Sequence, residues 1–536
     1  MRRNESECLS TVTNRRMRKR IVLAATVIVL LVYYYTRRLS KYQQSTRWHR
    51  LRTMIRISLE RIRPIVRLLL AMSRTERTVY APTLSFIQAA RGKALPSSSS
   101  SSSSSKKLIL YQWPLSYFSG KIRAFLRYQR VEFEQVVATP RILREVLLPA
   151  TKSHTVPQLR IGSTIIHDST SIMEEVVRTV PNATIVEPQT TRQRITCQIL
   201  ELMGDEWLLV PAFHFRWAYS GNGTLSQKMP MVENNSETNL LREHRKFNCA
   251  QWGHFLKPTS TEKEKETIGT FMIDNLMLNG YTSIKRCMRD LGVTDVTVHA
   301  WESSCRNFLS KFDEHLTLIP YVLGSKPSTA DFSLLGPIYA HLSRDPYPKH
   351  MMRKNYPNAF NWAKRLHDDG GGKPALRGRW MWNDSVPSTV LPLLRIFFKE
   401  MFPVLKRTCQ VLTEYIKEEK PVKLPCGSFG PGSIDQEVPY GPLTCEFELP
   451  VDEDNVVKGR RMVIPYHVWL LQRLEETVIK MTKSGERKKM RGFLSSIDGL
   501  ELLDLSKMLS GCRVKKIKGE LFVDYDGISS RRNKYK

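Results

Sequence analysis

The order of short patterned segments between residues 108 and 177 is the feature that most constrains the fold of this chain. Short apolar runs, typical of strands, alternate there with stretches in which apolar residues recur at helical spacing. Gly162-Ser163 separates the last two runs and predicts a hairpin turn. The expected elements are a strand at 108–111, a helix at 120–128, a strand at 131–137, a helix at 141–148, strands at 156–161 and 164–166, and a helix from 168. This order predicts two strand–helix units closed by a hairpin and a last helix.

Beyond about residue 190 the apolar spacing becomes helical, and no strand pattern is visible before about residue 445. The polar stretch 222–236 is expected to be a loop, and Asp368 to Gly372 is expected to be a flexible break. After about residue 480 the chain is basic and weakly patterned. The fold class that follows is an α/β domain followed by an all-helical domain.

The N-terminal region carries an apolar segment between basic flanks. Residues 21–36 contain an uncharged run from Ile21 to Tyr35, which predicts a single-pass transmembrane anchor, although a spanning helix usually needs about 20 residues. A cleaved signal peptide is less favoured because no small-residue cleavage site follows the run. Residues 1–20 are a basic N-terminus, and 37–106 are a basic stalk that ends in a serine-rich linker. Within this stalk, residues 47–73 fit either a helix on a membrane surface or an extended segment.

The net charge of +32 raises the question of nucleic-acid binding. From Met1 to Lys107 there are 23 Lys and Arg against 4 Asp and Glu, so 23 − 4 = +19 of the excess lies in the first fifth of the chain. A basic tail beside an apolar segment more often faces anionic lipid, and no nucleic-acid-binding motif accompanies it. Nucleic acid is therefore an unlikely partner. The nine cysteines are scattered and odd in number, which fits a reducing compartment and indicates neither a disulfide framework nor a metal site.

Three motifs within residues 108–177 carry chemistry. Ser116 precedes the first expected helix, where free N–H groups and the helix dipole favour an anion such as a thiolate, although serine is also a common helix cap. Val156-Pro157 stands before a strand, where an edge-strand proline is the plain alternative. Asp168-Ser169 opens the last helix, which by itself is only a capping signature.

Together these motifs resemble the glutathione S-transferase superfamily, and the resemblance covers roughly residues 107–480. It implies that Ser116 contacts the glutathione sulfur and that Val156 pairs with the glutathione backbone beside a cis Pro157. It also implies that Ser169 and the start of its helix hold the γ-glutamyl carboxylate, while Asp168 helps to bind the α-amino group. Tyr117 departs from the usual proline, which puts the turn geometry in question. Ser119 replaces the second cysteine of redox-active relatives, which excludes dithiol exchange.

The resemblance also implies a domain plan. It comprises a thioredoxin-like domain at 107–182, a helical domain at 190–370, a family extension at 380–480 and a basic tail at 481–536. Ser328 and Asp331 are expected to form the buried capping box of the helical domain. His214, Arg216, Trp217 and His341 are expected to be core groups more than site residues.

The function that this resemblance implies is conjugation of glutathione, the co-substrate, to a hydrophobic small molecule. The alternatives are a non-catalytic adaptor with this fold, which binds another protein, and a glutathione-dependent peroxidase or isomerase. A homodimer is the candidate assembly. The catalytic domain is expected to face the cytosol from the endoplasmic reticulum or the mitochondrial outer membrane.

Overall fold

The computed structural model describes residues 107–220, 235–277, 284–424, 443–451, 455–483, 487–517 and 520–535. The chain divides into two units, Met1–Pro82 and Thr83–Lys536, and every described residue lies in the second. The expected anchor at 21–36 and the stalk at 37–106 lie outside the described residues. Among the helices that are described, none combines the length and the apolar character needed to span a bilayer.

A mixed four-stranded sheet forms the first part of the described chain. Its strands lie in the order β2-β1-β3-β4, with β1 parallel to β2 and antiparallel to β3, and β4 antiparallel to β3. This is the thioredoxin-like arrangement expected from the sequence. The elements are β1 (Leu108–Gln112), α4 (Tyr117–Tyr128), β2 (Phe133–Val137), α5 (Pro140–Ile142), η2 (Leu143–Leu147), α6 (Leu148–Thr151), β3 (Gln158–Ile161), β4 (Thr164–His167) and α7 (Ser169–Thr179).

Burial explains why these segments form these elements. All five residues of β1 are buried, as a central strand covered on both faces requires. Helix α4 buries Ile122, Phe125 and Leu126, as its spacing predicts. Helices α14 (Thr329–Pro337) and α16 (Pro357–Asp369) of the helical region pack against it. The first helix of the α/β domain is therefore enclosed between the sheet and the helical region.

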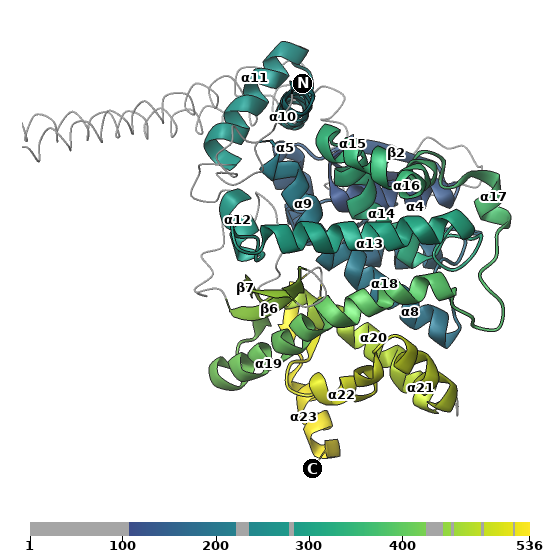
Figure 1. Cartoon of the computed structure of the whole chain (residues 1–536). Helices are drawn as coiled ribbons and strands as arrows, with labels where there is room; N and C mark the ends of the chain where they lie inside the picture. The colour runs from purple at the N-terminus through teal and green to yellow at the C-terminus, as the bar shows by residue number, and fades with distance from the viewer. Residues whose placement is uncertain are drawn as a thin grey trace, which may run out of the picture. The chain divides into compact units, whose positions relative to one another are not determined.

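The region after residue 190 is mostly helical, as expected, and the domain boundaries proposed from the sequence remain predictions. Figure 1 shows the long helix α13 lying beside α18, in agreement with their contacts. The helices are α8 (Thr191–Leu202), η3 (Met203–Trp207), α9 (Leu209–Ala218), α10 (Asn235–Leu256), α11 (Glu262–Phe271), η4 (Met272–Met277), α12 (Ile284–Asp290), α13 (Val298–Leu318), α14 (Thr329–Pro337), η5 (Ile338–Ser343), α15 (Pro346–Asn355), α16 (Pro357–Asp369) and α17 (Gly372–Arg377).

The capping box at the start of α14 is confirmed. The Ser328 backbone N–H and hydroxyl both donate to Asp331 Oδ2 at 2.8 Å, and Val322 N–H donates to Oδ1 at 3.0 Å. Burial raises the pKa of Asp331 to about 6. The expected flexible break at 368–372 is instead a packed turn, because a Cβ at Gly370 (φ +56°) would lie 2.4 Å from the Tyr128 backbone nitrogen.

The C-terminal part is more ordered than its sequence indicates. The basic tail after 480 is weakly patterned in sequence, yet apolar residues spread among its lysines, such as Leu494, Leu509 and Val514, are buried. Strand β5 also precedes residue 445, and two residues are too short to leave a periodic signal. The elements are η6 (Ser388–Val390), α18 (Leu391–Ile396), η7 (Phe397–Met401), α19 (Phe402–Glu419), β5 (Lys423–Leu424), β6 (Thr444–Pro450), β7 (Val456–Met462), α20 (Tyr466–Lys483), α21 (Arg487–Ser496), η9 (Leu500–Asp504), α22 (Leu505–Met508), β8 (Val514–Ile517), β9 (Glu520–Val523) and α23 (Tyr525–Tyr535).

Candidate functional site

The strand register brings the three sequence motifs to one end of the sheet. Tyr111 near the end of β1 pairs with Gln158 at the start of β3, and Gln158 pairs with His167 at the end of β4. The segment after β1, the residues before β3 and the residue after β4 therefore meet at the same edge. Ser116, Val156-Pro157 and Asp168-Ser169 occupy these three places.

Ser116 caps helix α4 and keeps a proton to donate. Its backbone is extended (φ −68°, ψ 130°), and its half-buried hydroxyl accepts the Ser119 N–H at 3.3 Å. Within the part of the chain that the structure describes, this hydroxyl donates to no acceptor. A hydroxyl has two acceptor sites and one proton, so capping the helix and donating to a ligand sulfur are compatible roles.

The turn before Ser116 is held by arginines from other elements. Arg123 Nη2 donates to the Pro114 carbonyl at 3.1 Å and Nη1 to Gln112 Oε1 at 2.6 Å. Arg344 also donates to the Pro114 carbonyl, and Arg216 Nη1 donates to Leu115 O at 2.9 Å. These bonds satisfy buried carbonyl groups and fix the backbone that presents Ser116.

Arg216 belongs to the set expected to be core groups, and all four of its members are buried. Its guanidinium pairs with Asp345, with Nε to Oδ2 at 2.6 Å and Nη2 to Oδ1 at 2.9 Å. His214 Nε2 lies 2.9 Å from Glu302 Oε1. These contacts give the residues structural roles in the helical region.

Tyr117 stands where the resemblance has proline. It is the first residue of α4, is 4% exposed, and donates its hydroxyl to the carbonyl oxygen of Gly204 in η3. Its ring also lies against Gly336 of α14, where a Cβ would approach a ring carbon to 2.7 Å. The tyrosine thus joins the start of α4 to the helical region.

The Val156–Pro157 bond is cis, as the resemblance implied. Pro157 is buried and Val156 is half-buried. No backbone hydrogen bond of Val156 is found among the described residues, although Gln158 onward is paired in β3. The N–H and C=O of Val156 therefore have hydrogen-bonding capacity for an extended peptide ligand.

Helix α7 begins at the same edge with Asp168 as its cap. Asp168 Oδ1 accepts the Ser171 N–H at 3.0 Å, and Ser169, the first helical residue, is 7% exposed. Asp168 has φ +82°, an unusual conformation for a residue other than glycine. The N–H groups of the first turn form a positive helix end suited to a carboxylate.

Asp168 is also bound by two residues from the C-terminal part of the chain. The Tyr466 hydroxyl donates to Oδ2 at 2.7 Å, and Lys516 Nζ lies 3.0 Å from Oδ1. Burial alone would raise the pKa of Asp168, but the Lys516 charge and these hydrogen bonds hold it well below the usual value. Sequence reasoning missed both partners. Tyr466 lies 298 positions from Asp168, and no local pattern distinguishes Lys516 from the other lysines of the tail.

A buried charge network supports the start of α7 and of α4. Lys121 of α4, with a fully buried side chain, lies 2.6 Å from Asp205 Oδ2 and 3.8 Å from Glu201 Oε1. Glu201 also accepts the Thr170 hydroxyl at 2.7 Å and pairs with Arg473 of α20 at 3.1 Å. Removing one partner of such a network would leave a buried charge uncompensated.

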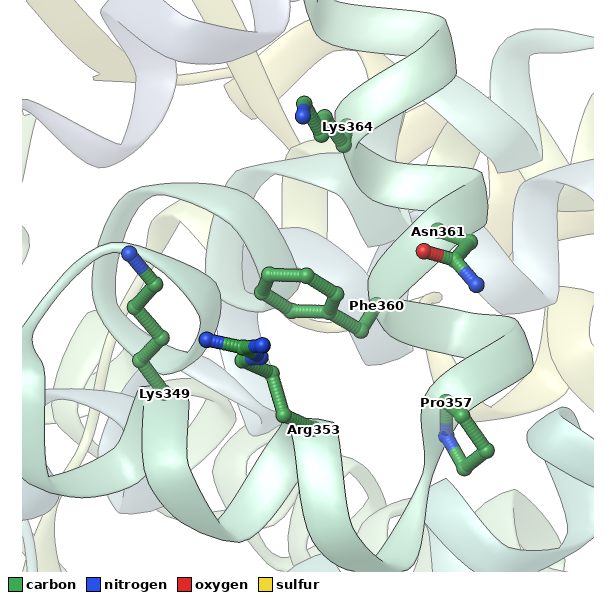
Figure 2. A pocket seen from close by; sticks show the side chains of 6 residues that line it. All are labelled: Lys349, Arg353, Pro357, Phe360, Asn361 and Lys364. Carbon is green, nitrogen blue, oxygen red and sulfur yellow. The ribbon is translucent and has the colours of Figure 1, made fainter.

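A hollow of about 440 Å³ lies elsewhere, between α15 and α16. Figure 2 shows Lys349 and Arg353 on one helix, with Phe360 and Lys364 on the other. None of the three cations has an ion-pair partner among the described residues. No predicted site residue lines this hollow, so it is separate from the edge that carries Ser116 and Asp168.

Comparisons with known proteins agree with the fold. Residues 110–184 match the family "Glutathione S-transferase, N-terminal domain". A search of curated proteins finds no match to this sequence.

Solved structures that match include the β-etherase LigF from Sphingobium sp. strain SYK-6, which is 17% identical, with 50% of this chain and 97% of that chain covered and a TM-score of 0.32. A glutathione S-transferase from Rhodospirillum rubrum F11 is 15% identical, covering 53% of this chain and 97% of its own, with a TM-score of 0.31. A Tau class glutathione S-transferase from mango, Mangifera indica, is 13% identical, covering 51% and 93%, with a TM-score of 0.29.

These identities and TM-scores are too low to carry an argument about chemistry. The assignment rests on the family match and on the sheet order, with its parallel β1–β2 pair and antiparallel β3–β4 hairpin. Residues 110–184 of this chain therefore match the family "Glutathione S-transferase, N-terminal domain" in sequence and have the thioredoxin-like sheet order.

Proposed function

We propose that this chain is a membrane-anchored glutathione transferase that conjugates glutathione to hydrophobic electrophiles. The observation that carries the proposal is the meeting, at one sheet edge, of a hydroxyl with a proton to donate, the Val156 backbone, which has no hydrogen-bond partner among the described residues, and a helix N-terminus. The hydroxyl suits a thiol, the backbone suits a peptide, and the helix N-terminus suits a carboxylate. Glutathione combines all three.

In this mechanism the protein stabilises the thiolate of glutathione. A free thiol has a pKa near 8.5, and the positive end of α4 together with a hydrogen bond from Ser116 would lower it. The thiol proton leaves to solvent, and the sulfur lone pair forms a carbon–sulfur bond with the electrophile. The leaving group departs with the electron pair of the bond that breaks. The peptide part of glutathione would pair with Val156, and its γ-glutamyl carboxylate would bind at Ser169.

The test is calorimetric titration of glutathione into the detergent-solubilised full chain. We expect binding in the millimolar range or tighter, weakened about tenfold by Ser169→Ala, since a hydrogen bond to a charged group contributes about 1.5–3 kcal/mol. Ser116→Ala is expected to leave the Kd nearly unchanged. It should lower kcat for 1-chloro-2,4-dinitrobenzene at least tenfold and move the pH–rate profile to higher pH.

One observation favours a second candidate, a non-catalytic adaptor with the same fold. The carboxylate of Asp168, which the resemblance assigns to the ligand, already binds Tyr466 and Lys516 of the chain itself. A folded protein that binds no glutathione at millimolar concentration would contradict the transferase and leave the adaptor.

The proposal includes the anchor at 21–36, with the catalytic domain in the cytosol. A membrane location would place the enzyme where lipophilic electrophiles concentrate. Either the endoplasmic reticulum or the mitochondrial outer membrane fits a short anchor with basic flanks.

A further inference from the structure

The carboxylate of Asp168 is saturated by groups of the chain itself. It accepts the Ser171 N–H at 3.0 Å, the Tyr466 hydroxyl at 2.7 Å and the Lys516 ammonium at 3.0 Å. The Asp168 side chain is 13% exposed and that of Lys516 is 9% exposed. Little room remains for another cation on this carboxylate.

Lys516 is held at this place by aromatic faces. Its ammonium lies 4.0 Å from the centre of the Trp469 ring and 5.1 Å from that of Tyr466, both on the first turn of α20. It also lies 3.4 Å from Ser171 Oγ. Cation–π contacts that are shielded from water favour a cation at this position over a neutral group.

The strand that carries Lys516 is fixed to the helix that carries Tyr466. The Gln472 side chain of α20 donates to Val514 O at 2.9 Å and accepts the Val514 N–H at 2.8 Å. Arg473 of the same helix binds Glu174 of α7 at 2.7 Å. Strand β8 and helix α20 therefore dock as one piece onto the start of α7.

We propose that Lys516 and Tyr466 are specificity-determining residues that occupy the subsite for the ligand's α-ammonium group. The inference rests on the proposed function and on the role that the family resemblance gives to Asp168, which is to bind that ammonium. The Lys516 side chain and the ligand both carry an ammonium group that binds the Asp168 carboxylate. The two ammonium groups therefore compete for this carboxylate. A thiol ligand that keeps the free carboxylate of the γ-glutamyl residue but lacks its amino group does not compete with Lys516.

The experiment compares two ligands on the full chain. The probes are glutathione and glutaryl-cysteinyl-glycine, which is glutathione without its α-amino group. In Lys516→Met the stem over Trp469 is retained and the charge is lost. We expect this variant to bind glutathione about tenfold more tightly than the wild type does, and to bind the deaminated ligand no more tightly. Lys516→Ala provides a second variant with the same expectation.

Lys515→Met is the matched control, because Lys515 precedes Lys516 on β8 but its half-exposed side chain pairs with Asp524 at 2.7 Å. It should bind both ligands like the wild type. Tyr466→Phe should tighten glutathione binding by a smaller factor than Lys516→Met, because it removes one neutral donor to Asp168. Circular dichroism melting curves establish that each variant is folded.

The outcomes separate the two proposals. Wild-type glutathione affinity in both folded Lys516 variants would overturn the subsite assignment while leaving the transferase in place. Equal tightening for both ligands would show that Lys516 acts through its bulk and would also overturn the assignment. If neither the wild type nor any folded variant binds glutathione, the transferase proposal is overturned, and this inference with it.

Discussion

At the scale of single residues, Tyr117 decides how the turn before α4 meets the helical region. The position would be a proline in many relatives that the sequence resembles, and a proline could not donate a hydrogen bond. Here the tyrosine hydroxyl binds the Gly204 carbonyl, and burial, followed by the charges of Asp205 and Glu206, raises the pKa of Tyr117 well above its usual value. The phenol therefore remains a neutral donor. Gly204 has no room for a side chain, because a Cβ there would lie 2.6 Å from the Ser333 carbonyl carbon.

Tyr117→Phe is expected to lower the free energy of unfolding by about 1–3 kcal/mol, because a buried carbonyl loses its donor. Tyr128→Phe is the matched control in the same helix, since within the described structure the buried Tyr128 hydroxyl has no hydrogen-bond partner. That variant should be as stable as the wild type or more stable. Urea denaturation of both variants measures the difference, and equal losses in the two would contradict the role given to Tyr117.

At the scale of elements, the C-terminal part is attached to the α/β domain through the start of α7. Lys516 of β8 and Tyr466 of α20 bind Asp168, and His167 lies beside this carboxylate. The Lys516 charge and the hydrogen bonds outweigh burial and hold the pKa of Asp168 well below its usual value, whereas burial lowers the pKa of His167 to about 4. Asp168 therefore stays ionised and His167 stays neutral between pH 5 and 8.

This predicts how the attachment depends on pH. A carboxylate whose pKa is lowered in the folded state stabilises the fold above its unfolded pKa of about 3.9, and that stability is lost as the pH falls toward the folded value. The stability difference between the wild type and Lys516→Met should thus be largest at pH 7.5, no larger at pH 5.0 and smallest at pH 3.5, because protonation of Asp168 in the variant removes its uncompensated buried charge. Urea midpoints at the three values test this. A difference that stays equal at all three pH values would mean that the charge of Asp168 does not control the contact.

At the scale of the whole molecule, the proposal that the catalytic domain faces the cytosol can be tested on two exposed asparagines. Asn182 and Asn383 each begin an Asn-x-Ser/Thr sequence and are exposed. In the lumen of the secretory pathway such positions would be accessible for glycosylation. In the cytosol they would stay unmodified.

We expect that glycosidase treatment of the full chain expressed in cells will not change its mobility on a gel. The control is the double variant Asn182→Gln and Asn383→Gln, which should migrate like the wild type. A shift on glycosidase treatment that this variant reduces would place the catalytic domain in the lumen and contradict the proposed topology.

The sequence by itself determined those parts of the fold and the site that depend on near neighbours in the chain. The strand and helix order from Leu108 to α7 follows from apolar spacing, and capping by Asp168 and by the Ser328–Asp331 pair involves residues at most three positions apart. The expectation of a cis Val156–Pro157 bond came from a family resemblance, and the structure confirms it. The roles of Ser116, Val156 and Ser169 toward a ligand stay predictions.

Only the tertiary structure decided which distant groups meet at the site. The tail after 480 lacks a periodic pattern, since its elements are short and its buried residues alternate irregularly with lysines, so its order comes from packing against α20. The pairing of Asp168 with Tyr466 joins residues 298 positions apart, and Lys516 reaches the same carboxylate from the tail. Charge attraction alone does not select Lys516 from the 83 lysines and arginines of the sequence, because each of them could pair with an aspartate equally well. The folded backbone decides, by bringing Lys516 within 3.0 Å of Asp168.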